Sequence, residues 1–140
     1  SLLGNYRASG LLYNFLVEFN LSISQKESGT TYHPALVKAI DYINNHYQSS
    51  ITMEELCGYC GVSKQHLCLL FRTLLHTRPM EYTAKRRIQA AKELLTSTSM
   101  TIEEIAEETG FCTASYFCKM FKRYEGITAI QFKLDFISTV

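Results

Sequence analysis

Apolar side chains recur every three or four residues along most of the chain, the spacing that places them on one face of an α-helix. One apolar stripe lies within residues 1–21, a second follows Pro34, and a third runs from Pro79 to about Thr96. No segment has the alternating pattern of a β-strand or the turn residues of a hairpin. With only two prolines and seven glycines among 140 residues, the chain is predicted to be all-α.

The same periodicity predicts the core and the organisation of the chain. Residues 1–21 are expected to form a helix, residues 22–32 a polar linker, and residues 33–140 a domain of their own. The helix from Pro79 would span roughly 27 Å, long enough to connect two units. Its candidate core residues are Met80, Tyr82, Ile88, Ala91, Leu94 and Leu95. A final helix, with Ile130, Phe132 and Phe136, is expected to close the chain.

A segment that begins at Thr52 recurs from Thr101, and each copy has the pattern of two short helices joined by a tight turn. Each first helix opens with Thr-x-x-Glu, in which the two side chains can cap each other's free backbone N–H groups. The turn residues that tolerate positive φ and the N-cap residues of the second helices are Gly61, Gly110, Ser63 and Thr113. Each copy is therefore a predicted helix-turn-helix, whose second helix can enter a DNA major groove.

Charge is segregated along the chain although the net charge is only +1. Between Ser63 and Lys92 there are seven Lys or Arg residues against the single carboxylate of Glu81. The first helices of the two copies carry Glu54, Glu55, Glu103, Glu104, Glu107 and Glu108. This pattern indicates a surface that faces phosphates and an opposite, solvated surface.

The second copy and the connecting helix resemble the DNA-binding domain of AraC-type transcription regulators, over about residues 35–136. The resemblance is carried by Ile105-Ala106, Gly110-Phe111, Tyr116 to Lys122 and Gly126-Ile127-Thr128, and by Tyr82, Arg87, Ala91, Leu94 and Leu95. Three residues depart from the family pattern: Ala129 replaces a usual proline, Lys133 a usual arginine, and His76 a frequent glycine. The resemblance implies an all-α double helix-turn-helix fold, and the departures affect only local geometry.

The resemblance also implies function and partners. It implies a cytoplasmic transcription regulator that binds double-stranded promoter DNA and contacts RNA polymerase. The regulator type is expected to be an activator, with repression as the alternative that the sequence leaves open. A sensing domain is expected N-terminal to this chain. A homodimer is compatible with the resemblance, formed through residues 1–21 or through that sensing domain.

Helical periodicity divides the second helices into buried and outward faces. In the first copy, Leu67, Leu70, Phe71 and Leu74 share the expected core face, and in the second copy Phe117, Met120 and Phe121 do. The outward residues, predicted to bind DNA, are Ser63, Lys64, Gln65, Cys68, Leu69 and Arg72 in the first copy and Thr113, Ala114, Ser115, Cys118, Lys119 and Lys122 in the second. Gln suits adenine edges, and Lys and Arg suit guanine or phosphate. An amphipathic helix also has a solvated face without any ligand, but the duplication and the resemblance favour DNA.

Several other features allow alternatives. Cys57-x-x-Cys60 near His66 has the spacing of a zinc or redox motif, but the second copy has Ala106 and Thr109 at these positions. Arg87 is predicted either to bind phosphate or to make structural contacts. Cys112, at a turn, is expected to be a partly exposed thiol, and the five cysteines are expected to be reduced, since no secretion signal accompanies them.

No pattern typical of a catalytic triad, a phosphate-binding glycine loop or paired catalytic carboxylates occurs, so no enzyme, cofactor or metal is predicted. No apolar run is long enough to cross a membrane. Two other classes remain as alternatives to a DNA-binding regulator. One is a helical adaptor that binds proteins through the same faces, and the other is a thiol-based sensor.

Overall fold

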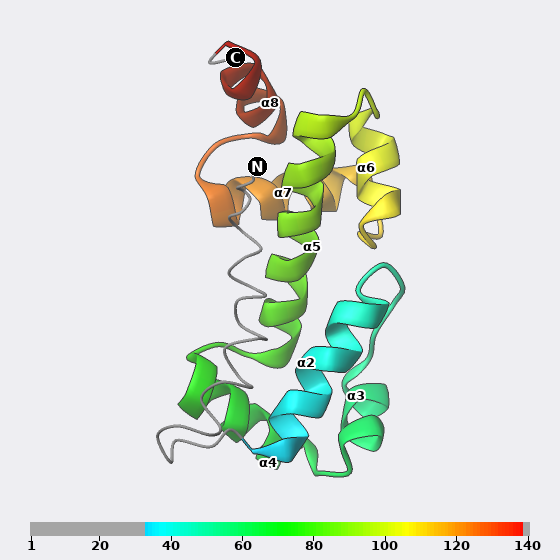
Figure 1. Ribbon diagram of the computed structural model, residues 1–140, viewed down its shortest axis with the longest axis vertical. Helices are drawn as coiled ribbons and strands as arrows, with labels where there is room; N and C mark the ends of the chain where they lie inside the picture. The colour runs from blue at the N-terminus through cyan, green and yellow to red at the C-terminus, as the bar shows by residue number, and fades with distance from the viewer. Residues whose placement is uncertain (1–32, 139–140) are drawn as a thin grey trace. The chain divides into compact units, whose positions relative to one another are not determined.

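The computed structural model describes residues 33–138, and every regular element in this range is helical (Figure 1). The predicted all-α class is therefore confirmed, whereas the helix and linker expected in residues 1–32 lie outside the described residues. The helices are α2 (Pro34–His46), α3 (Met53–Cys60), α4 (Lys64–Leu70), the π-helical turn η1 (Phe71–Leu75), α5 (Pro79–Ser97), α6 (Ile102–Glu108), α7 (Ala114–Glu125) and α8 (Ala129–Ser138). Within this range, no helix combines the length and apolar character that crossing a membrane requires.

The described residues divide into two compact units. The first contains residues 33–43 and 52–79, and the second contains residues 44–51 and 80–138. In the first unit, α2 lies beside α3 (Figure 1), and the buried side chains include Leu36, Ile40, Ile43, Leu56, Leu67 and Phe71. This unit contains the first helix-turn-helix, α3 and α4.

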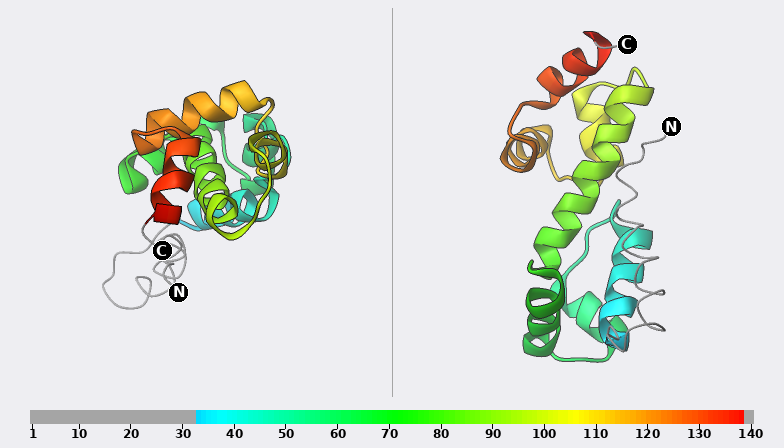
Figure 2. Two further views of the ribbon diagram at one scale, coloured as in Figure 1. Left: turned by 90° about the horizontal axis from the view of Figure 1, so that it is seen from above. Right: turned by 60° about the vertical axis from the view of Figure 1, so that its left-hand side comes forward.

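In the second unit, α6, α7 and α8 gather around the C-terminal part of α5 (Figure 2). Their buried side chains form one core cluster: Ile88, Ala91, Leu95, Ile105, Ala106, Phe111, Phe117, Met120, Phe121 and Ala129. Phe121 packs edge-on against both Phe117 and Phe132, with ring centroids 5.8 Å and 5.6 Å apart. Edge-to-face pairs of this kind add to the stability that burial gives.

One predicted core residue, Met80, is exposed in the structure, so that prediction is wrong, and two apolar residues of the expected final helix, Ile130 and Phe136, are exposed as well. Met80 and Ile130 are 36% and 58% exposed, and Phe136 is 42% exposed. Met80 and Ile130 each follow a buried first residue of a helix, Pro79 or Ala129. Since a helix turns by about 100° per residue, burying that first residue directs the next one outward. Leu70 and Leu74 are half-buried rather than buried.

The predicted helix caps are present in both copies. Thr52 accepts a hydrogen bond on Oγ1 from Glu55 N at 3.1 Å, and Glu55 Oε1 accepts one from Thr52 N at 3.2 Å. Thr101 and Glu104 form the same reciprocal pair, at 3.1 Å and 2.8 Å. Each pair satisfies N–H groups that have no partner within the helix, so both first helices start at defined residues.

The turns of the two copies differ in length and share a left-handed glycine. Gly61 and Gly110 have φ values of 73° and 95°, as predicted. From the glycine to the N-cap, the first turn is Gly61-Val62-Ser63, whereas the second has one residue more and ends at Thr113. His76 has a φ of 56°, in the left-handed region, at the end of η1.

Gly110 is constrained by its surroundings as well as by its φ. A Cβ atom there would clash with the Tyr47 carbonyl oxygen and would lie 2.9 Å from Arg87 Nε. At Gly61, by contrast, a Cβ atom would meet nothing within 4 Å. The second turn therefore needs glycine for two independent reasons, and the first turn for one.

We expect Gly61→Ala to lower the free energy of unfolding by about 1–2 kcal/mol, the cost of a left-handed alanine. Gly110→Ala should cost about 2–5 kcal/mol, because the clash with backbone adds to that strain. Urea unfolding followed by circular dichroism measures both. Equal losses in the two variants would show that the close approach at Gly110 is relieved without cost.

Candidate nucleic-acid interface

The second helix of the first copy begins at a capped residue and buries one face. Ser63 Oγ accepts a hydrogen bond from His66 N at 3.1 Å, which fixes the start of α4. Leu67 and Phe71 are fully buried in the first unit. The opposite face is therefore directed to solvent, and on it Lys64, Gln65, Leu69 and Arg72 are exposed.

The chemistry of this face suits DNA bases and phosphates. The Gln65 amide has a donor and an acceptor, as pairing with an adenine edge requires. Lys64 and Arg72 bring cationic donors, and the Ser63 hydroxyl keeps its own hydrogen to donate while it caps the helix. Cys68 is half-buried, so the expectation that it faces outward is only partly met.

The second helix of the second copy repeats this design. Thr113 Oγ1 accepts a hydrogen bond from Tyr116 N at 3.0 Å, and Phe117 and Phe121 are fully buried. The exposed predicted residues are Thr113, Ser115, Cys118, Lys119 and Lys122. Ala114 packs partly against the core cluster, so its predicted outward position is wrong. The reason is that Ala114 lies three residues before buried Phe117, on the same side of the helix.

Sequence reasoning missed two exposed residues of α7. Tyr116 is 46% exposed, and Arg123 is exposed beside Lys122. Tyr116 lies three residues before Lys119, so helical spacing alone could have placed it on the same outward face. It adds a large apolar surface with a hydroxyl tip to a face otherwise made of small and cationic side chains.

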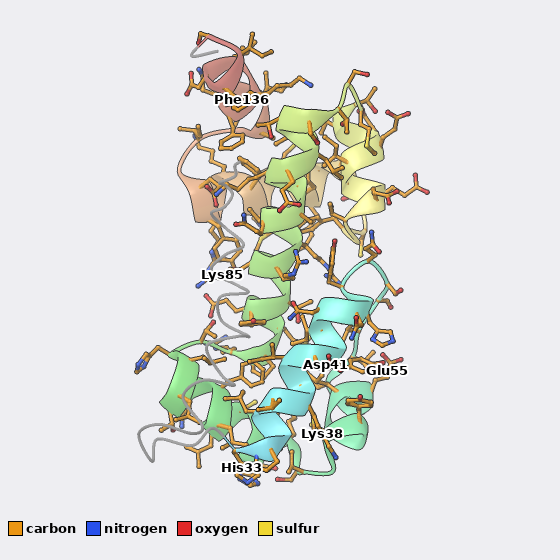
Figure 3. The ribbon with its side chains drawn as sticks, in the orientation of Figure 1. His33, Lys38, Asp41, Glu55, Lys85 and Phe136 are labelled. Atoms are coloured by element: carbon orange, nitrogen blue, oxygen red, sulfur yellow. The ribbon has the colours of Figure 1, made fainter. Side chains whose placement is uncertain are left out.

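The basic residues between Ser63 and Lys92 fall into two groups: some bind other residues of the protein, and others are exposed to solvent. Lys92 Nζ forms an ion pair with Glu125 Oε1 at 3.1 Å, and Arg86 Nε donates to Asn44 Oδ1 at 3.1 Å. Arg86 also lies over the Tyr47 ring, 4.4 Å from its centroid. Lys85 extends from α5 and is exposed (Figure 3). Within residues 33–138, no ion pair involves the cations of the two outward faces, Lys64, Arg72, Lys119 and Lys122.

Arg87 makes structural contacts, which favours one of its two predicted roles. Its Nε donates to Tyr47 O at 2.7 Å and its Nη2 to Ser49 O at 2.9 Å. Burial lowers the pKa of Arg87, whose guanidinium is also 6.0 Å from the centre of the Phe111 ring. Arg87 thus joins α5 to residues 47–49 and to the turn before α7, all within the second unit.

The five cysteines are free thiols in different environments. Burial raises the pKa of both Cys57 and Cys60, whereas Cys112 and Cys118 are exposed. Cys112 was predicted to be only partly exposed. Among the described residues, no three His, Cys, Asp or Glu side chains are grouped so that they could hold a metal ion. His33 and His66 lie close together, with ring centroids 5.2 Å apart, which their separation in sequence did not suggest.

Comparison with known proteins matches this chain to a helix-turn-helix family and to transcription regulators. The family model described as "Helix-turn-helix domain" matches residues 56–134. The transcriptional regulator GbdR of Pseudomonas aeruginosa is 35% identical over 97 residues, which are 69% of this chain and 26% of GbdR. The lactose operon transcription activator of Staphylococcus xylosus is 33% identical over 98 residues, 70% of this chain and 35% of that protein. The chain thus spans about a quarter to a third of these regulators.

A solved structure agrees with this assignment. The C-terminal domain of AraT, a response regulator from Geobacillus stearothermophilus, superposes with a TM-score of 0.71 at 30% sequence identity. The match covers 74% of this chain and 87% of that domain. Sequence and structure therefore point to the same family.

We expect Cys112 and Cys118 to react with iodoacetamide before Cys57 and Cys60 in the native protein. Raised pKa values leave Cys57 and Cys60 with less thiolate at neutral pH, and burial limits access to Cys60. Peptide mass spectrometry over a time course measures the order. The same reaction in urea is the control, where the five rates should converge. Early labelling of Cys60 in the native protein would contradict the described core.

Proposed function

Because the chain belongs to the AraC-type helix-turn-helix family, we propose that it binds promoter DNA in a sequence-dependent manner and regulates transcription. One observation carries this proposal. Each of the two helix-turn-helix motifs has a capped second helix with a fully buried aromatic or leucine face and an opposite face of exposed cationic and polar side chains. The matched relatives are transcription regulators rather than enzymes, and we propose the same for this chain.

The proposed mechanism uses α4 and α7 as recognition helices. Residues near the start of each helix would meet base edges, as in other helix-turn-helix proteins. On α4, Gln65 is the candidate reader of adenine and Lys64 of guanine or phosphate, while Arg72, in η1 directly after α4, is placed for the DNA backbone. On α7, Ser115 and Tyr116 offer hydroxyl and apolar contacts, and Lys119 and Lys122 offer charge.

We propose that the two recognition helices occupy successive major-groove segments of one site. A single chain with two such helices supplies two groove-binding units without a partner subunit. Its site therefore needs no two-fold symmetry, unlike the palindromes of symmetric dimers. Selection of bound sites from random duplexes tests the proposal. Enrichment of a non-palindromic sequence of about two turns supports it, and the absence of any enrichment would reject sequence-dependent binding.

We infer two partners beyond DNA from family membership. RNA polymerase is one, and a second copy of the full-length protein, joined through residues 1–21 or a sensing domain, is the other. Purified polymerase and a promoter carrying the selected site test the first, because added protein should change transcript yield. A cytoplasmic location follows from the same proposal, since bacterial promoter DNA is found there.

Gln65→Ala and Arg72→Ala should act differently on DNA binding. Loss of a base contact should cost about 1–3 kcal/mol and relax the sequence preference at one position, whereas loss of a phosphate contact should weaken binding to all sequences alike. Gel-shift titrations against the selected site and its single-base variants separate the two effects. Gln48→Ala, an exposed glutamine before α3, is the matched control and should change neither quantity. Wild-type behaviour of both test variants would remove α4 from the interface.

Replacing Lys119 and Lys122 together with alanine should shorten the protected region on the selected site. The intact chain should protect about two turns of duplex, and loss of the α7 cations should weaken protection of one half. Lys38→Ala removes an exposed cation from α2 and should leave the footprint unchanged (Figure 3). A wild-type footprint of only one turn, unaltered in the double variant, would mean that α7 does not contact DNA.

A further inference from the structure

Tyr116 places an aromatic ring on the outward face of α7, where it is 46% exposed. The other exposed residues predicted on this face are small or cationic: Thr113, Ser115, Cys118, Lys119 and Lys122. At the corresponding position of the first copy, α4 has His66, which is half-buried. The two second helices therefore differ at this position, and α7 alone presents a large apolar surface there.

The ring of Tyr116 leans toward the start of α7. Its centroid is 6.0 Å from that of Phe111, a core residue that lies before the helix and is only 5% exposed. Helical side chains generally point toward the N-terminus of their helix, and the contact with Phe111 agrees with this direction. In helix-turn-helix proteins, the residues near the N-terminus of the second helix contact base edges. The exposed part of the ring therefore lies at the end of α7 that would meet the bases.

The backbone that carries Tyr116 is fixed on both sides of the helix start. Tyr116 N donates to Thr113 Oγ1 at 3.0 Å, and the next residue, Phe117, is fully buried. The Phe117 ring also packs against Phe111, with centroids 5.3 Å apart. A tyrosine has only two side-chain torsions, so a ring held in this way loses little conformational freedom when it contacts a ligand.

The edges of the bases offer such a ring one suitable group in the major groove. Base pairs present hydrogen-bond donors and acceptors there, and thymine in addition presents the methyl group on C5. Covering this methyl group with the ring removes apolar surface of both partners from water, which favours binding. A single phenol hydroxyl cannot form the bidentate hydrogen bonds by which amide and guanidinium side chains read adenine and guanine.

We propose that Tyr116 selects thymine at one position of the DNA site by covering the C5 methyl group with its ring. The inference rests on the proposed function and adds to it the identity of one base in the half of the site that α7 contacts. Gln65 of α4 and Tyr116 of α7 would then specify different bases by different chemistry, hydrogen bonding in one half and apolar contact in the other.

Replacing each thymine of the selected duplex in turn by uracil tests this assignment, because uracil lacks the methyl group and keeps the O4 acceptor. Gel-shift titrations of the wild-type protein should show weaker binding at one thymine in the half that α7 protects. The expected loss is about fourfold, the value of one buried methyl group.

Three variants identify the group that contacts the methyl. Tyr116→Ala should bind the thymine duplex more weakly and should no longer distinguish it from the uracil duplex at that position. Tyr116→Phe keeps the ring and should keep the fourfold preference. Tyr59→Ala removes a tyrosine of similar exposure, 50%, from α3 and is the matched control that should also keep it. Unchanged preferences at the other positions of the site would show that Tyr116→Ala is folded.

Several outcomes would overturn the assignment. One is a wild-type protein that binds the selected site and has no uracil-sensitive thymine in the α7 half. Another is a fourfold preference that persists in Tyr116→Ala. A third is loss of the preference in Tyr116→Phe as well, since the hydroxyl rather than the ring would then be the contacting group. Failure to select any sequence would reject the proposed function and this inference with it.

Discussion

The arrangement of both motifs depends on burying one face of each second helix. Leu67 and Phe71 in the first unit, and Phe117 and Phe121 in the second, have no exposed surface. Truncating such a side chain in a core typically costs about 2–5 kcal/mol for leucine and about 3–5 kcal/mol for phenylalanine, so rotation of either helix about its axis is strongly opposed. Because these side chains point into the core, the opposite face of each second helix is directed toward solvent. The candidate DNA contacts are thus consequences of packing.

The turns before α4 and α7 set the position of each second helix along its own axis. The caps at Ser63 and Thr113 define where each second helix starts. A left-handed glycine follows the first helix, directly after α3 at Gly61 and one residue later, after Thr109, at Gly110. In the second unit, residues from other segments pack against the turn. Arg87 donates hydrogen bonds to Tyr47 O and Ser49 O, and Gly110, which has no side chain, leaves room for this contact. Arg87, which the sequence allowed as a phosphate ligand, therefore stabilises the unit that contains α7.

Local rules predicted the features that depend on neighbouring residues. The capping boxes, the glycine turns, the N-caps and the buried phenylalanines follow from residue type and helical spacing, and the structure has them. Features that depend on distant contacts were missed or wrong. Arg86 and Arg87 are partners of residues 44–49, which charge counting cannot reveal, and Met80 and Ile130 are exposed because their preceding residues are buried. At one departure from the family pattern, Lys133 in place of a usual arginine, the Nζ atom donates to a backbone carbonyl, Thr98 O, at 3.2 Å.

A salt titration of affinity for the selected duplex tests most directly that the outward faces of α4 and α7 bind DNA phosphates and bases. Four exposed cations, Lys64, Arg72, Lys119 and Lys122, lie on these faces. If each neutralises one phosphate, log affinity should fall linearly with log salt with a slope of about −4. A random duplex should bind more weakly at every salt concentration. Affinity that does not depend on salt, or that is the same for selected and random duplexes, would contradict the account.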